Sequence, residues 1–446
     1  MTSPQPLPPS PTRSGEAGPP EPRTARHTSR WIAACVLFGL ALRVAFALLY
    51  WVNQPLTHDE REYLALGRSV ARGEGFGYPA DEPSPGTGQQ FGRAPGYPLF
   101  LAALGVTAPA DRAPQRVQLA QACIGALGIW LIAAIAGRIA GPRAAMTAAA
   151  IAAVYPPLVW MPSYVLSETL YSTAALAAAL ALTPGGRRDA ASLTPAAASA
   201  RIAPAPDPRT PPSVWIGAVL TGIAILIRPV MLFFVPLAAL WLVWQRRTAA
   251  AVLFVAIAAL CVAPWTVRNH RVYGRWIAVA SEGGVTFWTG NHPLAVGDGD
   301  LAANVEIKRA ELAFRAAHPG LTPEALEPVY YRDAFSWIRR EPAAWLALLA
   351  RKAFYTVVPL GPSYAVHSAR YRVASVAPYL LILPAAIWGA WQWRRTRLAG
   401  PVALWLMAAA TIVAGLVFFP QERFRIPVID PALIVTAALP AGLRKR

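Results

Sequence analysis

Residues 31–52 read WIAACVLFGLALRVAFALLYWV, and after a five-residue connection residues 58–63 read HDEREY. The first stretch is apolar apart from Arg43 and exceeds the roughly 20 residues that a helix needs to cross a bilayer. It is too long for the apolar core of a signal peptide and lacks a small-residue cleavage site, which favours a retained anchor. Charges beside hydrocarbon are costly and are generally kept for chemistry. The adjacent carboxylates of Asp59 and Glu60 therefore predict an active site at the end of this helix.

The composition indicates a polytopic membrane protein. Hydrophobic residues make up 55% of the 446 positions and charged residues only 14%. Residues 117–137 carry no charge, and residues 144–186 carry only Glu168. The net charge of +18 is spread over short basic clusters between apolar runs, a pattern typical of membrane-protein loops and not of a nucleic-acid groove. The three cysteines lie inside apolar runs, at spacings that suit neither a metal site nor a disulfide framework.

The apolar runs predict an all-α bundle of ten membrane-spanning helices. Their expected ranges are 31–52, 116–137, 144–162, 163–183, 213–228, 229–245, 248–267, 376–393, 400–419 and 428–443. The apolar segment 342–360 is interrupted by Arg351 and Lys352, so we expect an interfacial or re-entrant helix there.

The basic residues of the short loops predict the orientation. With the N-terminus inside, ten basic residues and no acidic one fall in the short cytoplasmic loops and at the C-terminal end. This orientation defines five regions, listed in chain order: a disordered cytoplasmic tail at 1–30, a membrane domain at 31–446, and within that domain a first outer loop at 53–115, a cytoplasmic linker at 184–212 and a long outer loop at 268–375. The long outer loop is expected to hold helices at 301–318 and 323–340.

This topology brings charges from distant parts of the sequence to one membrane face. The residues expected near the outer surface are Asp59, Glu60, Arg93, Arg228, Arg268, Glu422 and Arg423. Glu168 is expected about five residues into the fourth span, roughly 7–8 Å below its outer end. The convergence predicts an active site between the membrane and the outer aqueous phase.

Structural roles compete with functional ones at several of these positions. Thr57 and Glu60 fit a capping box, so Glu60 suits capping as well as catalysis. Arg93 lies in a Pro-Gly turn, where it suits either a lipid headgroup or a bound phosphate. A carboxylate within a span is functional by default, although Glu168 also suits an ion pair with an arginine of a neighbouring helix. The histidines show no spacing typical of a metal site.

Six short motifs follow one another along the chain. They are Asp59-Glu60 after the first span, RAPGYP at 93–98, SETL at 167–170, PWTVRN at 264–269, Gly283-Gly284 with WTGN at 288–291, and ERFRIP at 422–427. In this order and on this topology the chain resembles bacterial members of the GT-C glycosyltransferase superfamily, specifically the family 39 and aminoarabinose-transferase-like branch. The similarity runs from about residue 31 to the C-terminus.

The resemblance implies a GT-C-type transmembrane bundle with interfacial helices in the first outer loop. It implies transfer of a sugar, with inversion, from a polyprenyl-phosphate donor to a hydroxyl group of a lipid, glycan or protein acceptor. The implied location is the bacterial plasma (inner) membrane, with multiple crossings and an active site that faces the periplasm or exterior.

The resemblance also implies roles for individual residues. Asp59 matches the acid that takes the acceptor proton, and Glu60 and Glu168 join it as catalytic candidates. Because the leaving group is a phosphate, its charge calls for cations, and the expected set is Arg93, Arg228, Arg268, Arg423 and Arg425. Further site candidates are Tyr63, Tyr97, Asn291 and Glu422. Some relatives carry a metal-binding carboxylate beside the phosphate-binding basic residue. Phe91 and Gly92 stand there in this sequence, so no divalent metal is assigned.

A transporter or flippase of lipid-linked sugars is the alternative function. Such a protein would carry charges through the depth of its spans and on both faces. Here almost every embedded ionisable residue lies near an outer end, with Arg43 as the main exception. This distribution favours an enzyme.

Overall fold

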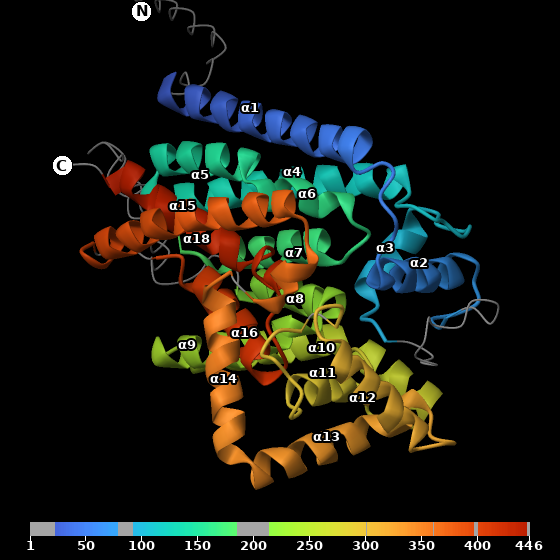
Figure 1. Cartoon of the computed structure of the whole chain (residues 1–446). Helices are drawn as coiled ribbons and strands as arrows, with labels where there is room; N and C mark the ends of the chain where they lie inside the picture. The colour runs from blue at the N-terminus through green and yellow to red at the C-terminus, as the bar shows by residue number, and fades with distance from the viewer. Residues whose placement is uncertain are drawn as a thin grey trace, which may run out of the picture.

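In the computed structural model the chain forms an all-α bundle whose long helices run side by side (Figure 1). The structure describes residues 23–78, 92–184, 214–299, 301–359, 361–396 and 400–443, and no strand occurs among them. The expected fold class is therefore confirmed.

The helices follow one another closely along the chain. Their bounds are α1 Arg23–Ala45, α2 His58–Ala71, α3 Gly96–Ala103, α4 Gln115–Ala140, α5 Pro142–Val154, α6 Pro156–Trp160, α7 Glu168–Leu182, α8 Val214–Ile227, α9 Phe234–Trp244, α10 Thr248–Tyr273, α11 Gly283–Gly290, α12 Val305–Ala316, α13 Pro323–Arg340, α14 Pro342–Val357, α15 Ala369–Arg394, α16 Val402–Val417, α17 Glu422–Arg425 and α18 Ile429–Leu443. Short helical turns named η1, η2, η5 and η6 cover Phe46–Tyr50, Met161–Ser163, Pro229–Phe233 and Pro362–Val366.

Each expected span coincides with an apolar helix or helix pair. Within the described residues, four helices are long and apolar enough to cross a membrane: Arg26–Tyr50, Gln115–Ala140, Thr248–Tyr273 and Ala369–Arg394. A bent pair, Pro142–Val154 with Pro156–Ser163, passes the same test with an angle of 64° between its parts. The others are shorter apolar helices: Glu168–Leu182, Val214–Ile227, Pro229–Trp244, Val402–Val417 and Ile429–Leu443.

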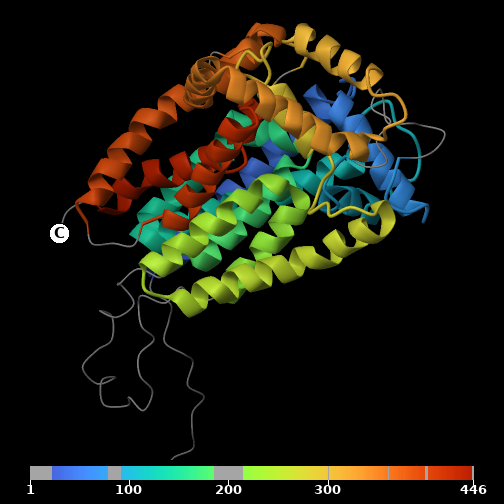
Figure 2. The ribbon, with the colours of Figure 1, turned by 90° about the horizontal axis from the view of Figure 1, so that it is seen from below.

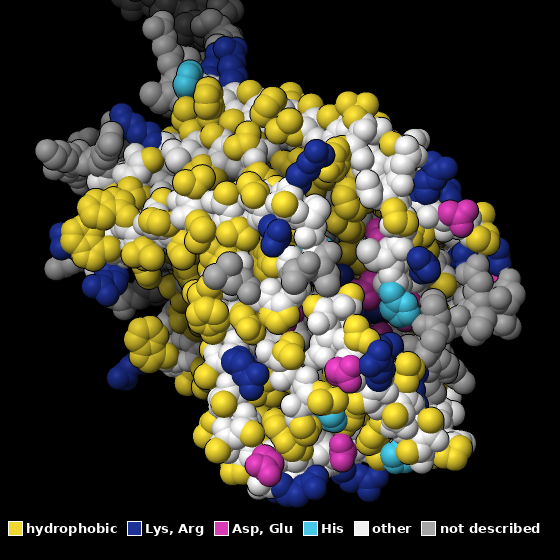
Figure 3. Space-filling model, viewed as in Figure 1, with side chains coloured by type: hydrophobic (Ala, Val, Ile, Leu, Met, Phe, Trp, Pro, Cys, Tyr) yellow, Lys and Arg dark blue, Asp and Glu magenta, His cyan; other side chains and the backbone are white. Residues whose placement is uncertain are grey.

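The outer surface of the bundle is suited to lipid. Large apolar side chains point away from the protein along the long helices, such as Leu260 of α10 at 71% exposure and Leu381 of α15 at 78%. Figure 3 shows hydrophobic side chains spread over the helices at the upper left, whereas acidic side chains gather at the right and bottom. Exposed apolar surface on this scale is the mark of a hydrocarbon-facing protein. Figure 2 shows α8, α9 and α10 side by side on one flank of the bundle.

Glycines allow the helices to approach closely. A Cβ on Gly389 of α15 would lie 2.0 Å from the carbonyl oxygen of Thr436 in α18. A Cβ on Gly442 of α18 would lie 2.0 Å from the carbonyl oxygen of Ala140 in α4. In lipid, apolar surface does not drive helices together, so such close packing of small residues supplies much of the attraction.

Arg43, the charge in the middle of the first span, caps a broken helix. Pro156 and Pro157 have no N–H, so the carbonyls of Ala152 and Ala153 lack the donors that a continuous helix would supply. Arg43 replaces them, because its Nη2 donates to Ala152 O at 3.3 Å and its Nη1 to Ala153 O at 3.4 Å. The side chain is only 1% exposed. Since backbone groups in a membrane must be satisfied within the protein, this arginine has a structural reason to be there.

Short helices from the segments 53–115 and 268–375 gather at one end of the bundle. In Figure 1, α2 and α3 lie at the right, opposite the start of α1 and the end of α18 at the left. The helices expected in the long outer loop are present as α12 and α13. Helix α14, in the segment expected to be interfacial or re-entrant, runs across the direction of the long helices (Figure 1).

Two expected boundaries are wrong. Residues 23–30, expected in a disordered tail, form the first turns of α1, because this segment contains neither proline nor glycine and continues directly into the apolar run. Glu168, expected about five residues inside a span, is the first residue of α7, because the η2 turn and extended backbone at Tyr164 precede it. Residues 1–22 of the expected tail and 185–212 of the expected linker lie outside the described residues.

Replacing Arg43 with leucine is expected to lower the stability of the bundle. Two carbonyls would lose their donors, at a cost of about 2–4 kcal/mol in the free energy of unfolding. Thermal unfolding of the detergent-solubilised protein measures the change. Adding Pro156→Ala and Pro157→Ala to Arg43→Leu restores backbone N–H groups and is expected to recover much of the loss. If the proline substitutions leave the loss unchanged, Arg43 does not act by capping.

Candidate active site

The turn that opens α2 sets the position of Asp59. The backbone N–H of Glu60 donates to Thr57 Oγ1 at 3.4 Å, and Glu60 Oε2 accepts the Thr57 backbone N–H at 2.8 Å. This is the expected capping box. Glu60 Oε1 accepts the backbone N–H of Val165 at 2.8 Å and so ties α2 to the segment before α7. Both oxygens of this buried carboxylate are engaged, which favours the capping role for Glu60 and leaves Asp59 for chemistry.

Asp59 lies between two arginines. Its Oδ1 accepts from Arg93 Nη2 at 2.6 Å, and its Oδ2 accepts from Nη2 of Arg423, which comes from the far end of the sequence. Burial by itself would raise the pKa of Asp59, but Arg93 and Arg423 hold it well below its usual range. The side chain keeps 21% exposure, so an ionised carboxylate faces the open part of the site.

Arg93 is surrounded by three carboxylates. Besides its contact with Asp59, its Nε donates to Glu62 Oε2 at 2.9 Å and lies 3.3 Å from Glu282 Oε1. Its guanidinium also lies over the Tyr63 ring, 5.3 Å from the centroid. Glu62 is held from its other side by His58, whose Nε2 is 3.3 Å from Glu62 Oε1. Arg93 thus joins the two α2 carboxylates, Asp59 and Glu62, to Glu282.

A second carboxylate, Glu168, joins two further arginines. Its Oε1 lies 2.8 Å from Arg228 Nη1 and 3.9 Å from Arg423 Nε. The neighbouring Ser167 Oγ is within hydrogen-bond distance of both the Tyr63 hydroxyl at 3.2 Å and Arg228 Nη1 at 3.3 Å. The sequence offered two roles for Glu168, and the structure shows the ion pair with an arginine of a neighbouring helix.

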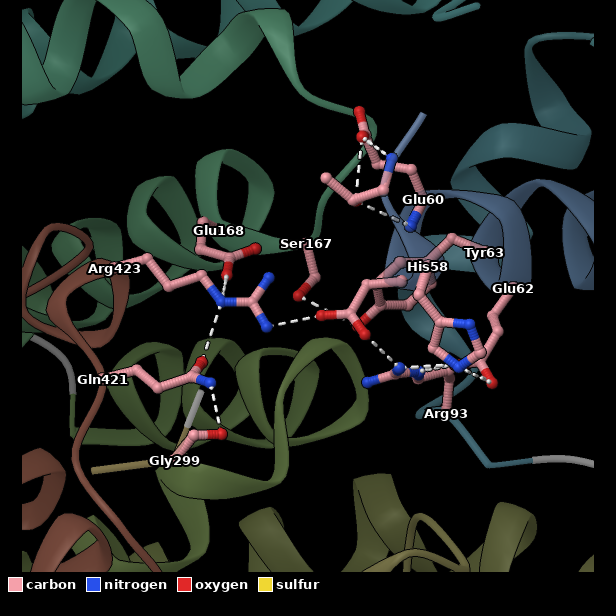
Figure 4. Close-up of polar contacts among 12 residues, drawn as sticks. His58, Glu60, Glu62, Tyr63, Arg93, Ser167, Glu168, Gly299, Gln421 and Arg423 are labelled. Atoms are coloured by element: carbon pink, nitrogen blue, oxygen red, sulfur yellow. Dashed lines mark hydrogen bonds and ion pairs between the residues drawn. The ribbon is translucent and has the colours of Figure 1, made fainter. Parts of the chain in front are cut away.

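These contacts form one chain of alternating charges, which we name the ion-pair chain: Arg93, Asp59, Arg423, Glu168 and Arg228. Figure 4 shows Arg93, Arg423 and Glu168 of this chain. Its members come from the turn before α3, from α2, from α17, from the start of α7 and from the turn before η5. The sequence predicted that these five residues would converge on one face, and the structure brings them together.

Other members of the site were missed from the sequence. Glu62 follows Asp59 by three residues, so both lie on the same face of α2, and this spacing could have revealed it. Glu282 precedes α11 and carries no local signal. Gln421 accepts from Arg423 Nε at 3.0 Å and donates to Gly299 O at 2.9 Å (Figure 4). The ring of Phe424 lies 4.7 Å from the guanidinium carbon of Arg228.

Folding shifts the pKa values of the Glu62 and Glu282 carboxyl groups in opposite directions. Burial raises the pKa of Glu282 to about 7, and the negative charges of Glu62 and Asp59 add to this effect against the opposing effect of Arg93. Burial also acts on Glu62, but His58 and Arg93 outweigh it and lower the pKa of this group. Near neutral pH Glu62 is therefore ionised, whereas Glu282 takes up a proton more readily than an ordinary glutamate.

Two predicted site residues, Arg268 and Asn291, lie outside the ion-pair chain. Arg268 donates to Phe76 O at 3.1 Å, and its guanidinium lies over the Trp265 ring at 4.9 Å. Asn291 donates to Val417 O at 2.8 Å and accepts from Lys352 Nζ at 3.1 Å. Its contacts in the structure join the end of α11 to α14 and α16.

Three other predicted residues have contacts elsewhere. Arg425 donates to Ser375 O at 2.8 Å and lies 3.6 Å from Asp430. Tyr97 donates to Gln121 Oε1 at 2.8 Å and packs edge-on against Tyr63, which contacts the chain through Arg93 and Ser167. Glu422 faces a cavity next to the ion-pair chain.

The carboxylates of the site are not arranged around an open metal position. Asp59, Glu62 and Glu282 converge on the guanidinium of Arg93, so a cationic side chain already occupies the point that they share. Among the described residues no group of three His, Cys, Asp or Glu side chains has the arrangement that a metal ion needs. These donors do not fit a metal, and the chemistry proposed for the site uses none.

Comparison with known proteins identifies a solved structure with the same fold. No model of a known protein family matches the sequence, and no curated protein matches it. An Archaeoglobus fulgidus oligosaccharyltransferase tethered with an acceptor peptide superposes over 93% of this chain and 50% of its own length, with a TM-score of 0.51 and 13% identity. The chain has the GT-C fold.

A bacterial structure also matches. ArnT from Cupriavidus metallidurans bound to undecaprenyl phosphate aligns over 93% of this chain and 77% of its own, with 15% identity and a TM-score of 0.41. The chain spans about half the length of the archaeal enzyme. At 13% identity the likeness to the archaeal structure establishes the fold and not the activity.

Because the pKa of Glu62 is lowered on folding and that of Glu282 is raised, glutamine substitution at the two positions is predicted to have opposite effects on stability. A raised pKa in the folded state stabilises the protein at low pH, and this contribution is lost as the pH rises through about 7. Glu282→Gln is therefore expected to match the wild type at pH 5 and to exceed its thermal stability at pH 8.

The matched variant Glu62→Gln is expected to behave in the reverse way. The pKa of Glu62 is lowered on folding, so its contribution is present above the ordinary value of 4.5 and disappears as the pH falls below it. The variant should be less stable than the wild type at pH 8, with a smaller difference near pH 4. Thermal unfolding scans from pH 4 to pH 8.5 measure both. Identical pH profiles for the two variants would contradict the assigned charge states.

Proposed function

We propose that the protein is an integral-membrane inverting glycosyltransferase. It transfers a sugar from a polyprenyl-phosphate donor to a hydroxyl group of a lipid, glycan or protein acceptor. The observation that carries this proposal is the ion-pair chain, which holds two carboxylates among three arginines at one end of an apolar bundle. The donor class comes from the motif resemblance, and the GT-C fold supports it.

The residues suit an inverting displacement. The acceptor oxygen attacks the anomeric carbon while the bond from that carbon to the phosphate oxygen breaks. Asp59 takes the hydroxyl proton, and the bonding electrons leave with the polyprenyl phosphate. Arg423 and Arg228 face the charge that develops on this leaving group. Two carboxylates that hold these arginines in the free enzyme are Asp59 and Glu168.

Donor binding would also activate the base. A phosphate bound to Arg423 competes with Asp59 for the same guanidinium. When that cation turns to the phosphate, the pKa of Asp59 rises toward its ordinary range, because part of the interaction that lowers it is gone. Arg93 remains on the other oxygen of Asp59 and keeps the carboxylate in position. Proton acceptance is thereby coupled to the presence of the donor.

The proposed location is the bacterial plasma membrane, with the site facing the periplasm or exterior. Two features support this orientation. The basic short loops favour an inside N-terminus. Helices α2 and α3, which frame Asp59 and Arg93, lie opposite the ends of α1 and α18 nearest the chain termini (Figure 1).

Incubation of the purified protein with a panel of polyprenyl-phosphate monosaccharides and membrane extract tests the proposal. Mass spectrometry is expected to show a new glycoside together with released polyprenyl phosphate. The transporter alternative predicts no new glycoside and instead movement of labelled lipid-linked sugar between the leaflets of reconstituted vesicles. That result would replace the proposal.

Asp59→Asn is expected to lower the rate of sugar transfer by about 10²–10⁴-fold, because the amide cannot take the acceptor proton. Binding of undecaprenyl phosphate should be retained, and the variant should still fold, with a lower thermal stability because Arg93 and Arg423 lose the carboxylate between them. Single-turnover transfer with the substrate found in the panel measures the rate. Wild-type activity in this variant would remove Asp59 from the mechanism.

Arg423→Gln and Arg93→Gln are expected to differ in the step that they impair. Arg423→Gln should weaken binding of undecaprenyl phosphate by about tenfold or more, since a charged contact to the phosphate is lost. Arg93→Gln should mainly lower the rate of transfer, because it releases Asp59. Binding titrations and kinetics on both variants measure the difference, with the exposed Arg309→Gln as control. The expectation from sequence that Arg93 holds the phosphate directly predicts equal losses of affinity instead.

A further inference from the structure

Helix α11 is capped by a residue from another helix. Glu282, at the N-cap position of α11, makes no side-chain hydrogen bond to its own first turn. Glu327 of α13 supplies the acceptor instead, because its Oε2 accepts the backbone N–H of Gly284 at 2.5 Å. A helix start without such an acceptor leaves backbone donors unsatisfied. Glu327 therefore stabilises the start of α11.

The glycine pair at the start of α11 allows this contact. A Cβ on Gly284 would lie 2.5 Å from the carbonyl oxygen of Glu327 and 2.9 Å from its Oε2. A Cβ on Gly283 would lie 2.6 Å from the hydroxyl oxygen of Tyr331, one turn further along α13. These distances leave no room for a side chain. The Gly283-Gly284 motif is thus explained by the close approach of α11 to α13.

The cap leaves the Glu282 side chain to the ion-pair chain. Glu282 Oε1 lies 3.3 Å from Arg93 Nε. The other two carboxylates on Arg93, those of Asp59 and Glu62, both belong to α2. Glu282 therefore fixes Arg93 relative to a second part of the fold. Asp59 in turn depends on Arg93 for the contact at its Oδ1.

The opposite end of α11 contacts the segment that leads to Arg423. Asn291, the residue after α11, donates to the carbonyl oxygen of Val417 at 2.8 Å. Val417 is the last residue of α16, and the α17 turn with Arg423 follows it in the chain. Eight residues of helix, a length of about 12 Å, lie between the two ends of α11. Helix α11 therefore supports both of the arginines that flank Asp59.

We propose that Glu327 is a positioning residue for the transfer reaction. It holds the start of α11 so that Glu282 stays on Arg93, and Arg93 in turn keeps Asp59 in place. The inference rests on the proposed transferase function. Glu327 acts through the backbone of α11 and through Glu282, and it connects the segment 268–375 to the proposed base.

Two substitutions separate the cap from the charge of Glu327. Burial raises the pKa of Glu327 to about 8, against the N–H groups of Gly284 and Val285, which lower it. A neutral acceptor oxygen is therefore a close substitute, and Glu327→Gln is expected to transfer sugar at a rate within about twofold of the wild type. Glu327→Ala removes the acceptor and should lower the rate by about tenfold, because a catalytic group is misplaced.

The affinity for undecaprenyl phosphate should stay within about twofold of the wild type in both variants, since the arginines proposed to bind phosphate are unchanged. Single-turnover transfer and binding titrations measure the two quantities. Thermal unfolding shows whether each variant is folded. Glu327→Asp, which is shorter by one methylene group, should show the same pattern with a smaller loss and replaces the alanine variant if that variant does not fold.

A double-mutant cycle tests whether Glu327 acts through Glu282. Glu282→Ala alone should lower the rate by a similar factor, and adding Glu327→Ala should cost at most about twofold more. The matched control is Asp333→Ala, which removes another contact between the same two helices, from Trp288 Nε1 to Asp333 Oδ2 at 2.7 Å. The control should lower thermal stability but leave the rate within about twofold of the wild type.

Three results would overturn the inference. The losses from Glu327→Ala and Glu282→Ala multiply in the double variant, or Asp333→Ala lowers the rate as much as Glu327→Ala does, or Glu327→Gln is as slow as the alanine variant. Absence of transfer by the wild type itself has a different meaning, because it rejects the proposed function and with it this role of Glu327.

Discussion

An alternating chain of opposite charges, running from Arg93 through Asp59, Arg423 and Glu168 to Arg228, is the interaction on which the rest of the site depends. Each charge is largely removed from water, which is unfavourable for an isolated ion, and each inner member has an opposite charge on both sides. Removing one member leaves its neighbours uncompensated, at a cost of about 3–5 kcal/mol for a buried pair. The chain therefore holds helix ends from distant parts of the sequence at one level of the bundle.

The same pairing would make the site responsive to the anionic donor proposed for it. Arginines that are bound by carboxylates in the free protein can exchange them for a phosphate without exposing a new charge to hydrocarbon. Such an exchange changes the charge around Asp59 and so links the proposed base to the proposed donor. Glu282, with a pKa of about 7, adds a carboxyl group beside Arg93 that can gain or lose a proton as the local charge changes.

The membrane places a second constraint, which concerns the backbone. Where prolines interrupt the helix after α5, the freed carbonyls need donors from within the protein, and Arg43 provides them. At the other end of the bundle, the Thr57–Glu60 capping box satisfies the start of α2 and at the same time presents Asp59 to the arginines. Glycines such as Gly389 allow the helices around this framework to pack backbone against backbone. The bundle therefore contains charged side chains that satisfy the backbone, such as Arg43, beside those proposed for chemistry, such as Asp59. The contacts of each side chain distinguish the two roles.

The sequence by itself determined the apolar helices, the capping box at Thr57, the helix at 323–340 and the convergence of Asp59, Arg93 and Arg423, because run length, residue spacing and loop charge are local properties. Only the tertiary structure decided which charge meets which. Arg423 and Arg425 are two residues apart, yet one pairs with Asp59 and the other with Asp430. Glu282 joins Arg93 from a loop nearly two hundred positions away, without any local signal. Partner choice depends on how helix ends are placed in space, and that placement arises from packing between segments that no short stretch of sequence contains.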